Sequence, residues 1–144
     1  MATIKLKKYG NAVDEYTAGG TITPGDLVKF NSSGQVIAHN VAGGMAMKAF
    51  AVEDEFQGKS VTDTYTSGIK VQVWFARPGD EVWARLAASQ NVAIGDFLES
   101  AGDGTLRKYS GASAGVAEWP ANVVGVALEA SNVAQIVRLK VKVI

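Results

Sequence analysis

The sequence predicts an all-β protein: a small β-barrel or sandwich built from two internally duplicated β-hairpin units, with an extended N-terminal arm. Two observations predict this fold class. Several short segments alternate apolar and polar residues, and a period of two places the apolar side chains on one face of a pleated strand. A turn motif also occurs twice at a fixed offset of 70 residues, which indicates a duplicated structural unit.

The duplicated motif couples a tight turn to a β-hairpin. Its first copy occupies residues 23–38 and its second copy residues 93–108. Three positions keep their residue type at this offset: Gly25, Asp26 and Gly34 return as Gly95, Asp96 and Gly104. Glycine supplies the positive φ of such turns, and both aspartates are expected to accept hydrogen bonds from backbone N–H groups. We therefore expect two hairpins that superpose.

Further strand candidates surround the hairpins. Residues 3–7 alternate near the start, residues 69–75 close the first copy and residues 137–143 close the second. Residues 81–88 have the propensity for two helical turns, but residues 81–85 follow a third Pro-Gly-Asp turn, and we favour a strand there. The product is a barrel or sandwich of about ten short strands with pseudo-twofold internal symmetry.

The domain organisation follows from these segments. We expect an N-terminal arm over residues 1–14 and a single β domain over residues 15–144. Within the domain the repeat copies span about 21–75 and 91–144. Residues 51–53 return at an offset of 76, so the second copy is expected to carry an insertion, which falls in residues 110–119.

The charge is zero overall but unevenly distributed. Six basic residues lie near the ends: Lys5, Lys7, Lys8, Arg138, Lys140 and Lys142. Two interpretations stay open, because lysines protect edge strands from aggregation and basic ends also suit an acidic partner surface. Neither the net charge nor any charge run points to nucleic acid or a membrane.

The composition also limits the chemistry that the side chains can perform and the cellular compartment in which we expect the protein. With no cysteine, the sequence offers no disulfide, thiolate nucleophile or cysteine zinc site. The first twenty residues lack the apolar region of a signal peptide, and no apolar run reaches the roughly 20 residues that span a bilayer. We expect synthesis in a cytoplasm and no membrane partner.

The candidate chemical motifs are weak. Residues 111–115 match G-x-S-x-G, but Ser113 lacks the strand, helix and downstream histidine that a nucleophile elbow needs. The only histidine, His39, has no partner motif and is expected to pack as a partly buried ring. The acidic run 53–55 cannot turn three consecutive carboxylates towards one ion. The sequence therefore predicts no enzyme, no catalytic residue, no metal site and no cofactor.

The three tryptophans allow two interpretations. Exposed in a row, they would suit a carbohydrate-binding face, whereas buried aromatics supply core or interface area. We favour core or oligomer interface for Trp74 and Trp83, and an interface for Trp119.

Taken together, these segments resemble the head decoration, or capsid cement, proteins of tailed bacteriophages. The resemblance rests on the paired turns 24–28 and 94–98, on residues 50–53 and 124–129, and on the closing strand 136–143. It implies a non-enzymatic β protein that binds the outer surface of an expanded capsid, as a homotrimer that clamps neighbouring major capsid subunits. It also implies localisation in the virion.

On this view the arm contributes a strand or wraps against a capsid subunit, since main-chain pairing gives such β-augmentation its affinity. The candidate capsid or oligomer interface residues are Ile4, Lys5, Leu6, Lys7, Lys8, Tyr9 and Trp119. The alternative is a carbohydrate-binding or adhesion module of a phage tail, a fibre or a cell surface.

Overall fold

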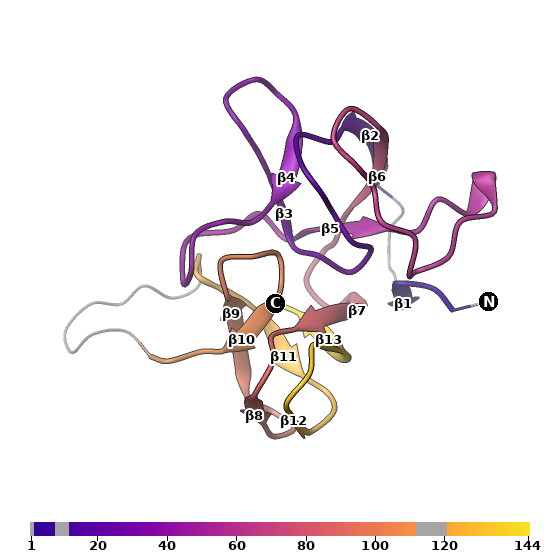
Figure 1. Ribbon diagram of the computed structural model, residues 1–144. Coiled ribbons are helices and arrows are strands. Elements are labelled where there is room, and N and C mark those ends of the chain that lie inside the picture. Colours follow the sequence, from indigo (N-terminus) through magenta and orange to yellow (C-terminus); the bar gives the residue numbers. More distant parts are fainter. Residues whose placement is uncertain (1, 8–11, 112–120) are drawn as a thin grey trace.

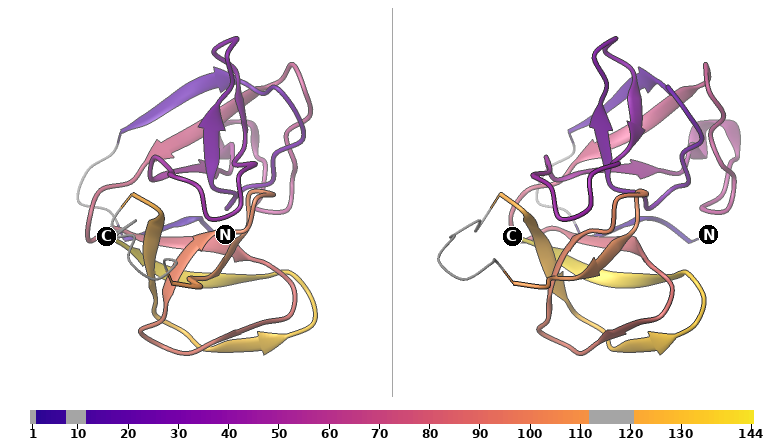
Figure 2. Two further views of the ribbon diagram at one scale, coloured as in Figure 1. Left: turned by 90° about the vertical axis from the view of Figure 1, so that its left-hand side faces the viewer. Right: turned by 60° about the vertical axis from the view of Figure 1, so that its left-hand side comes forward.

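The computed structural model describes residues 2–7, 12–111 and 121–144. Nearly all of the regular structure is β, and the predicted all-β class is confirmed. The ribbon divides into two lobes that follow each other along the chain, the first half above and the second half below in Figure 1. The two views of Figure 2 show the same two-lobed arrangement.

The second half forms a closed five-stranded barrel, here named barrel 2. Its strands are β7 (Glu81–Leu86), β9 (Phe97–Ser100), β10 (Leu106–Lys108), β11 (Val123–Ala127) and β13 (Val137–Val143). They pair in the order β7-β10-β9-β11-β13, and β13 pairs back with β7. All contacts are antiparallel except the one between β10 and β7. Closure leaves no free sheet edge around this circuit.

The first half, named barrel 1, repeats this strand circuit, but two of its strand contacts are single isolated bridges. Its strands are β2 (Val13–Thr17), β3 (Val28–Phe30), β4 (Val36–Ala38), β5 (Ala49–Val52) and β6 (Lys70–Phe75). The sheet β2-β6-β5 and the hairpin β3-β4 are joined by two isolated bridges. Leu27 bridges Phe50 antiparallel, and Ala18 bridges Val36 parallel. The parallel bridge stands where barrel 2 has its β10–β7 contact.

The strand register shows that the duplication reaches further than the sequence motif. Val13 opposite Trp74 in barrel 1 corresponds to Glu81 opposite Lys142 in barrel 2, an offset of 68 for both residues. The strands β2 and β7 are therefore equivalent, although they precede the predicted copies 21–75 and 91–144. β2 also begins inside the predicted arm 1–14.

Changes in the offset locate the loops in which the copies differ. The offset is 70 in the hairpins β3-β4 and β9-β10, 76 at β5 and β11, and 68 again at β6 and β13. The connection from β5 to β6 is therefore eight residues longer than its equivalent in barrel 2. It contains a short 3-10 turn, η1 (Glu55–Gln57). In barrel 2 the strands β8 (Gln90–Val92) and β12 (Ser131–Val133), not expected from the sequence, pair as a ribbon.

Three turns of the same geometry precede strands β3, β7 and β9, at residues 23–26, 77–80 and 93–96. In each, the aspartate Oδ2 accepts the N–H of the residue three positions earlier at 2.8 Å, which confirms the expected role of Asp26 and Asp96. The preceding glycine has a φ between 93° and 97° in all three, as the third position of a type II turn requires.

Two hydrophobic clusters fill the molecule. One lies inside barrel 1 and includes Val28 and Val71. The larger one fills barrel 2 and extends to the outward faces of Leu27, Phe50 and Trp74 in barrel 1. Because strand residues alternate between faces, β5 and β6 serve both clusters. The barrels thus share a core.

The expected pseudo-twofold symmetry between the two units is wrong. A twofold axis would require the turn 93–96 to contact β2 as the turn 23–26 contacts β7. A Cβ placed on Gly25 would lie 3.1 Å from the carbonyl oxygen of Trp83, whereas one placed on Gly95 would meet no atom within 4 Å. The interface is therefore heterologous, with different faces of two like barrels in contact.

Candidate functional site

The N-terminal arm lies against its own chain through β1 (Lys5–Lys7), which pairs antiparallel with β7. Ile4 is fully buried, and its N–H donates to Glu53 Oε2 at 3.1 Å. The Ile4 carbonyl accepts the Trp83 N–H at 2.9 Å. In this conformation the Ile4 side chain belongs to the core of its own chain and is not presented to a partner.

The other candidate interface residues differ in accessibility. Leu6 is 40% exposed, and Lys5 is half-buried beside it. Lys8, Tyr9 and Trp119 lie outside the described residues. A role for Lys5, Leu6 and Lys7 at an interface stays a prediction.

An open groove of about 440 Å³ lies beside the arm. It is lined by Ala2, Thr3, Leu6, Trp83, Glu129 and Lys140. The Arg138 guanidinium lies 5.5 Å from the centroid of the Trp83 ring, within cation–π range. Trp83 is half-buried and Trp74 is fully buried, so these two tryptophans do not form the exposed row that a carbohydrate platform needs.

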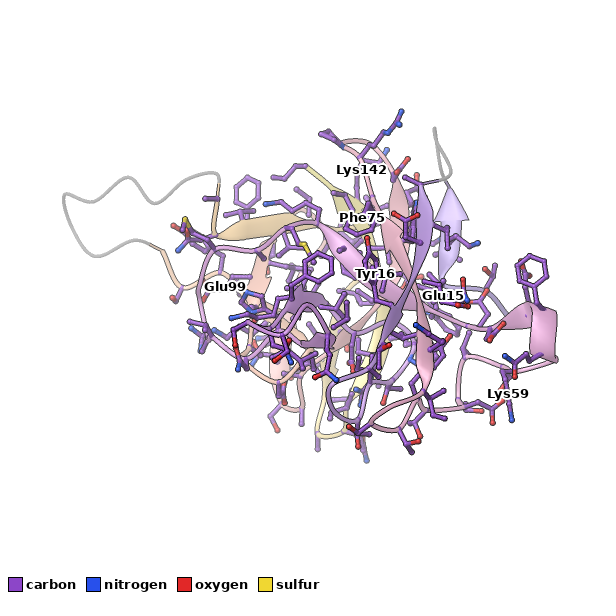
Figure 3. All side chains as sticks on the ribbon, turned by 90° about the horizontal axis from the view of Figure 1, so that it is seen from above. Glu15, Tyr16, Lys59, Phe75, Glu99 and Lys142 are labelled. Atoms are coloured by element: carbon purple, nitrogen blue, oxygen red, sulfur yellow. The ribbon has the colours of Figure 1, made fainter. Side chains whose placement is uncertain are left out.

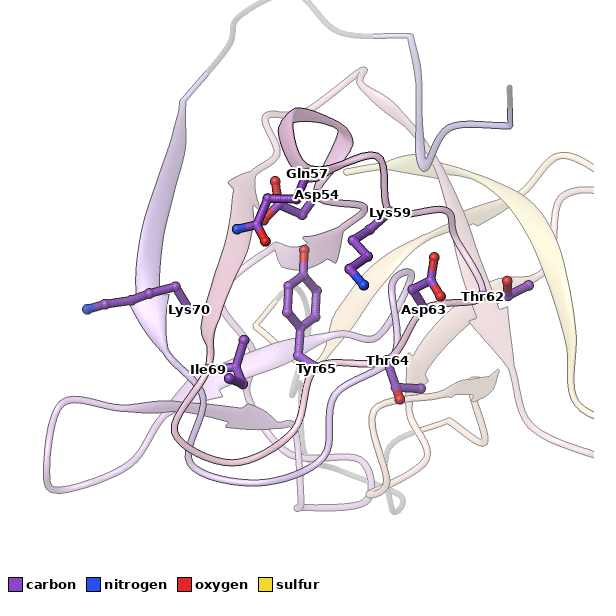
Figure 4. Close-up of a pocket in the computed structure, with 9 residues that line it drawn as sticks. All are labelled: Asp54, Gln57, Lys59, Thr62, Asp63, Thr64, Tyr65, Ile69 and Lys70. Atoms are coloured by element: carbon purple, nitrogen blue, oxygen red, sulfur yellow. The ribbon is translucent and has the colours of Figure 1, made fainter.

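The β5–β6 connection of barrel 1 is eight residues longer than the equivalent connection of barrel 2. At its tip, in η1, the Phe56 side chain is 91% exposed. The same connection borders a hollow of about 280 Å³, shown in Figure 4. Its lining is mostly polar and comprises Asp54, Gln57, Lys59, Thr62, Asp63, Thr64, Tyr65, Ile69 and Lys70. The hollow therefore offers hydrogen-bonding groups and charges of both signs.

The hollow contains no arrangement for acid–base or nucleophilic catalysis among its described residues. Asp63 Oδ2 accepts the Ser60 N–H at 2.6 Å, and this bond lowers the pKa of the carboxyl. The Tyr65 hydroxyl donates to the Val52 carbonyl at 2.6 Å. These contacts hold the loop in place.

Tyr65 provides a pH-dependent prediction. Burial raises its pKa to about 12 from a usual 10.0, because the phenolate would lose hydration. In the window between these values the unfolded chain ionises first, so the stability contributed by Tyr65 is complete below pH 10 and is lost as the pH rises towards 12. We expect phenolate absorbance to show one tyrosine that ionises near pH 12, and this step should disappear in Tyr65→Phe. An unchanged titration curve in that variant would contradict this assignment.

His39 is a structural residue at the junction of the two barrels. It is 2% exposed, its Nε2 donates to the Met45 carbonyl at 2.9 Å, and its Nδ1 lies 2.7 Å from Ser100 Oγ. The expected packing role is thus accompanied by two hydrogen bonds. Ser113 lies outside the described residues. Within residues 2–7, 12–111 and 121–144, no group of three or more histidine, aspartate or glutamate side chains could hold a metal ion.

Three charged residues gather where the turn 23–26 meets barrel 2: the buried Asp26 and the half-buried Arg85 and Arg138. Arg85 Nη1 donates to Asp26 Oδ1 at 2.7 Å, and Arg138 Nη2 donates to the Pro24 carbonyl at 3.0 Å and to the Val61 carbonyl. Burial raises the pKa of Asp26 despite Arg85, so desolvation outweighs the attraction of the cation. Burial and the neighbouring Arg85 lower the pKa of Arg138. This junction was not expected from the sequence, because its members lie on distant strands.

Fold and surfaces together define a tandem β-barrel protein whose two barrels are joined through a shared core. In the described part of the chain no helix has the length and hydropathy to cross a membrane. No protein-family model matches the chain, and no curated protein matches its sequence.

A solved structure is similar in fold over almost the full length of the chain. It is the head fiber gp8.5 N base in bacteriophage phi29, with a TM-score of 0.56 and 15% sequence identity. The similarity covers 94% of this chain and 98% of that chain. At this identity the likeness shows the fold.

Proposed function

We propose that this chain is a structural virion protein of a tailed bacteriophage that binds the outer surface of the capsid. It stabilises the expanded shell by bridging major capsid subunits, as a homotrimer and without catalysis. The observation that carries the proposal is the likeness in fold to a phage head fiber base over 94% of the chain.

The surfaces of the molecule are consistent with a binding role. The hollow beside the long connection has no paired base and nucleophile among its described residues, and the exposed Phe56 lies on a connection whose length differs between the two copies. A protein that bridges subunits needs contact area at several points, and simultaneous contacts multiply the apparent affinity without any chemical step.

Co-sedimentation with capsid shells tests the proposal. We expect the protein to pellet with expanded shells and not with unexpanded shells, and to raise the melting temperature of the expanded ones. Failure to pellet with expanded shells at micromolar concentrations would overturn the proposal.

Phe56 is expected to be an anchor of shell binding. Its side chain is 91% exposed on the connection that only barrel 1 extends, and aromatic side chains at the centre of an interface dominate binding energies. We expect Phe56→Ser to raise the dissociation constant for expanded shells about 30-fold, the effect of losing one hot-spot side chain.

Met45→Ser is the matched control, since Met45 is 74% exposed on a different loop. It should bind shells like the unmodified protein. Equal binding by Phe56→Ser and by the unmodified protein would remove Phe56 from the interface.

A further inference from the structure

Equivalent turns of the two barrels differ in solvent exposure. In barrel 1 the turn 23–26 is covered by barrel 2, and Pro24, Gly25 and Asp26 are all buried. In barrel 2 the turn 93–96 faces outward: Ile94 is 70% exposed, and there is open space beside Gly95. A large apolar side chain thus stands exposed at the position where barrel 1 makes its contact.

The covered turn shows what such a contact consists of. Arg85 in β7 donates its N–H to the Gly25 carbonyl at 3.1 Å and its guanidinium to Asp26. Arg138 in β13 donates to the Pro24 carbonyl at 3.0 Å. The turn therefore docks on the outward face of two neighbouring strands that supply cations to its carboxylate and carbonyl groups.

In barrel 1 the two equivalent positions are not covered by a turn, although the same face is buried further along β6 at Trp74. The register places Thr17 of β2 where barrel 2 has Arg85, and Lys70 of β6 where it has Arg138. Lys70 is exposed, and its Nζ donates to Thr17 Oγ1 at 3.1 Å. A cation and a hydroxyl therefore remain at the two positions that receive a turn in barrel 2.

The charges on either side are complementary. The outward turn brings Asp96, and the receiving face brings Lys70. Next to the turn, Lys108 is exposed and pairs with Asp96 at 2.9 Å. On β2 of the receiving face Glu15 is exposed and accepts a hydrogen bond from Gln72 Nε2 at 2.7 Å. Figure 3 shows Glu15 on the opposite side of β2 from Tyr16 and Phe75, which pack towards the interior of barrel 1. Each surface thus carries an acid and a base that the other can pair.

We propose that the turn 93–96 of one chain docks on the β2–β6 face of a second copy, and so repeats between chains the contact that the turn 23–26 makes within a chain. The occupant is a second copy because the face that receives such a turn is a face of this chain, and the intrachain contact supplies its geometry. The contact is heterologous, and heterologous contacts form rings when the rotation closes. The inference names the surfaces of self-association and does not depend on shell binding.

Mass measurement is the first test. We expect the unmodified protein to assemble, and Ile94→Lys, which brings a like charge towards Lys70, to raise the dissociation constant of self-association at least about 30-fold. Because Ile94 is exposed, this variant should keep the circular dichroism spectrum of the parent. Met45→Ser is the matched control, since it removes an exposed apolar side chain from another surface and should keep the assembled mass.

Cross-linking is the second test, and the cysteine-free sequence suits it. We expect the double variant Ile94→Cys with Lys70→Cys, treated with a short bismaleimide, to give covalent oligomers that end at the size of the ring. Each single variant should remain uncross-linked, because a heterologous contact joins one residue of each kind.

Three results would overturn the inference. They are a mass of 15.1 kDa for the unmodified protein at every concentration, an unchanged mass for Ile94→Lys, and cross-linking of a single-cysteine variant. Loss of shell binding in Ile94→Lys with its mass unchanged would assign the turn to the capsid instead.

Discussion

Replacing Asp26 by alanine is expected to lower the free energy of unfolding by about 3 kcal/mol, the lower end of what breaking a buried ion pair costs. Asp26 is 2% exposed, accepts the Thr23 N–H at 2.8 Å and pairs with Arg85 at 2.7 Å. Its removal leaves Arg85 beside Arg138 without the carboxylate between them. Urea denaturation followed by tryptophan fluorescence measures the change.

Asp96→Ala provides the matched control. Asp96 makes the same turn bond, from the Ala93 N–H at 2.8 Å, but it is more exposed and its ion-pair partner Lys108 is also exposed. We expect a much smaller loss of stability, since exposed pairs contribute little. Asp26→Asn keeps an oxygen for the turn bond and removes the charge. Its loss of stability should be smaller than that of Asp26→Ala and larger than that of Asp96→Ala. Equal losses in Asp26→Ala and Asp96→Ala would show that burial of the first turn does not matter.

Replacing Trp74 by alanine is expected to lower the free energy of unfolding by about 4 kcal/mol, the usual cost of truncating a buried tryptophan. Trp74 is fully buried and belongs, with Phe50 and Leu27, to the part of the core that joins the two barrels. The cavity would open at this junction, so both barrels should lose stability together in a single transition.

Trp74→Phe separates lost packing from lost polar contacts. The buried Trp74 Nε1 has no hydrogen-bond partner among the described residues, so phenylalanine removes no bond there. We expect a clearly smaller loss than in Trp74→Ala, because an unpaired buried N–H itself costs free energy. Trp83→Ala, at a half-buried position, should also cost less than Trp74→Ala. Two separate transitions in Trp74→Ala would contradict the shared core.

Several elements were predictable from the sequence because they depend on neighbouring residues. The strand Val137–Val143 alternates clearly enough to be identified by period alone, whereas the preceding Pro-Gly-Asp turn favoured a strand at Glu81–Leu86. The three aspartate-capped turns follow from glycine and aspartate at fixed positions. The ribbon of β8 and β12 was missed because Gln90–Val92 and Ser131–Val133 are too short to show a period.

The candidate site was less predictable. Ile4 was expected at an interface because it stands in a basic arm, yet it is fully buried beside Glu53. The exposure of Phe56 could have been suspected from the length of its connection, since long loops in small domains usually serve binding. The register that makes β2 equivalent to β7 has no sequence signal, because Val13–Thr17 and Glu81–Leu86 share little residue identity.

The sequence by itself determined the all-β class, the duplication and the turn geometry, since alternation and turn chemistry act over a few residues. Only the tertiary structure decided which of two like turns is buried. Asp26 and Asp96 occupy the same position of the same motif, yet one meets Arg85 within the molecule and the other faces outward. The physical reason is that the two barrels pack through different faces, and burial, desolvation and ion pairing at each face depend on residues far away in the chain.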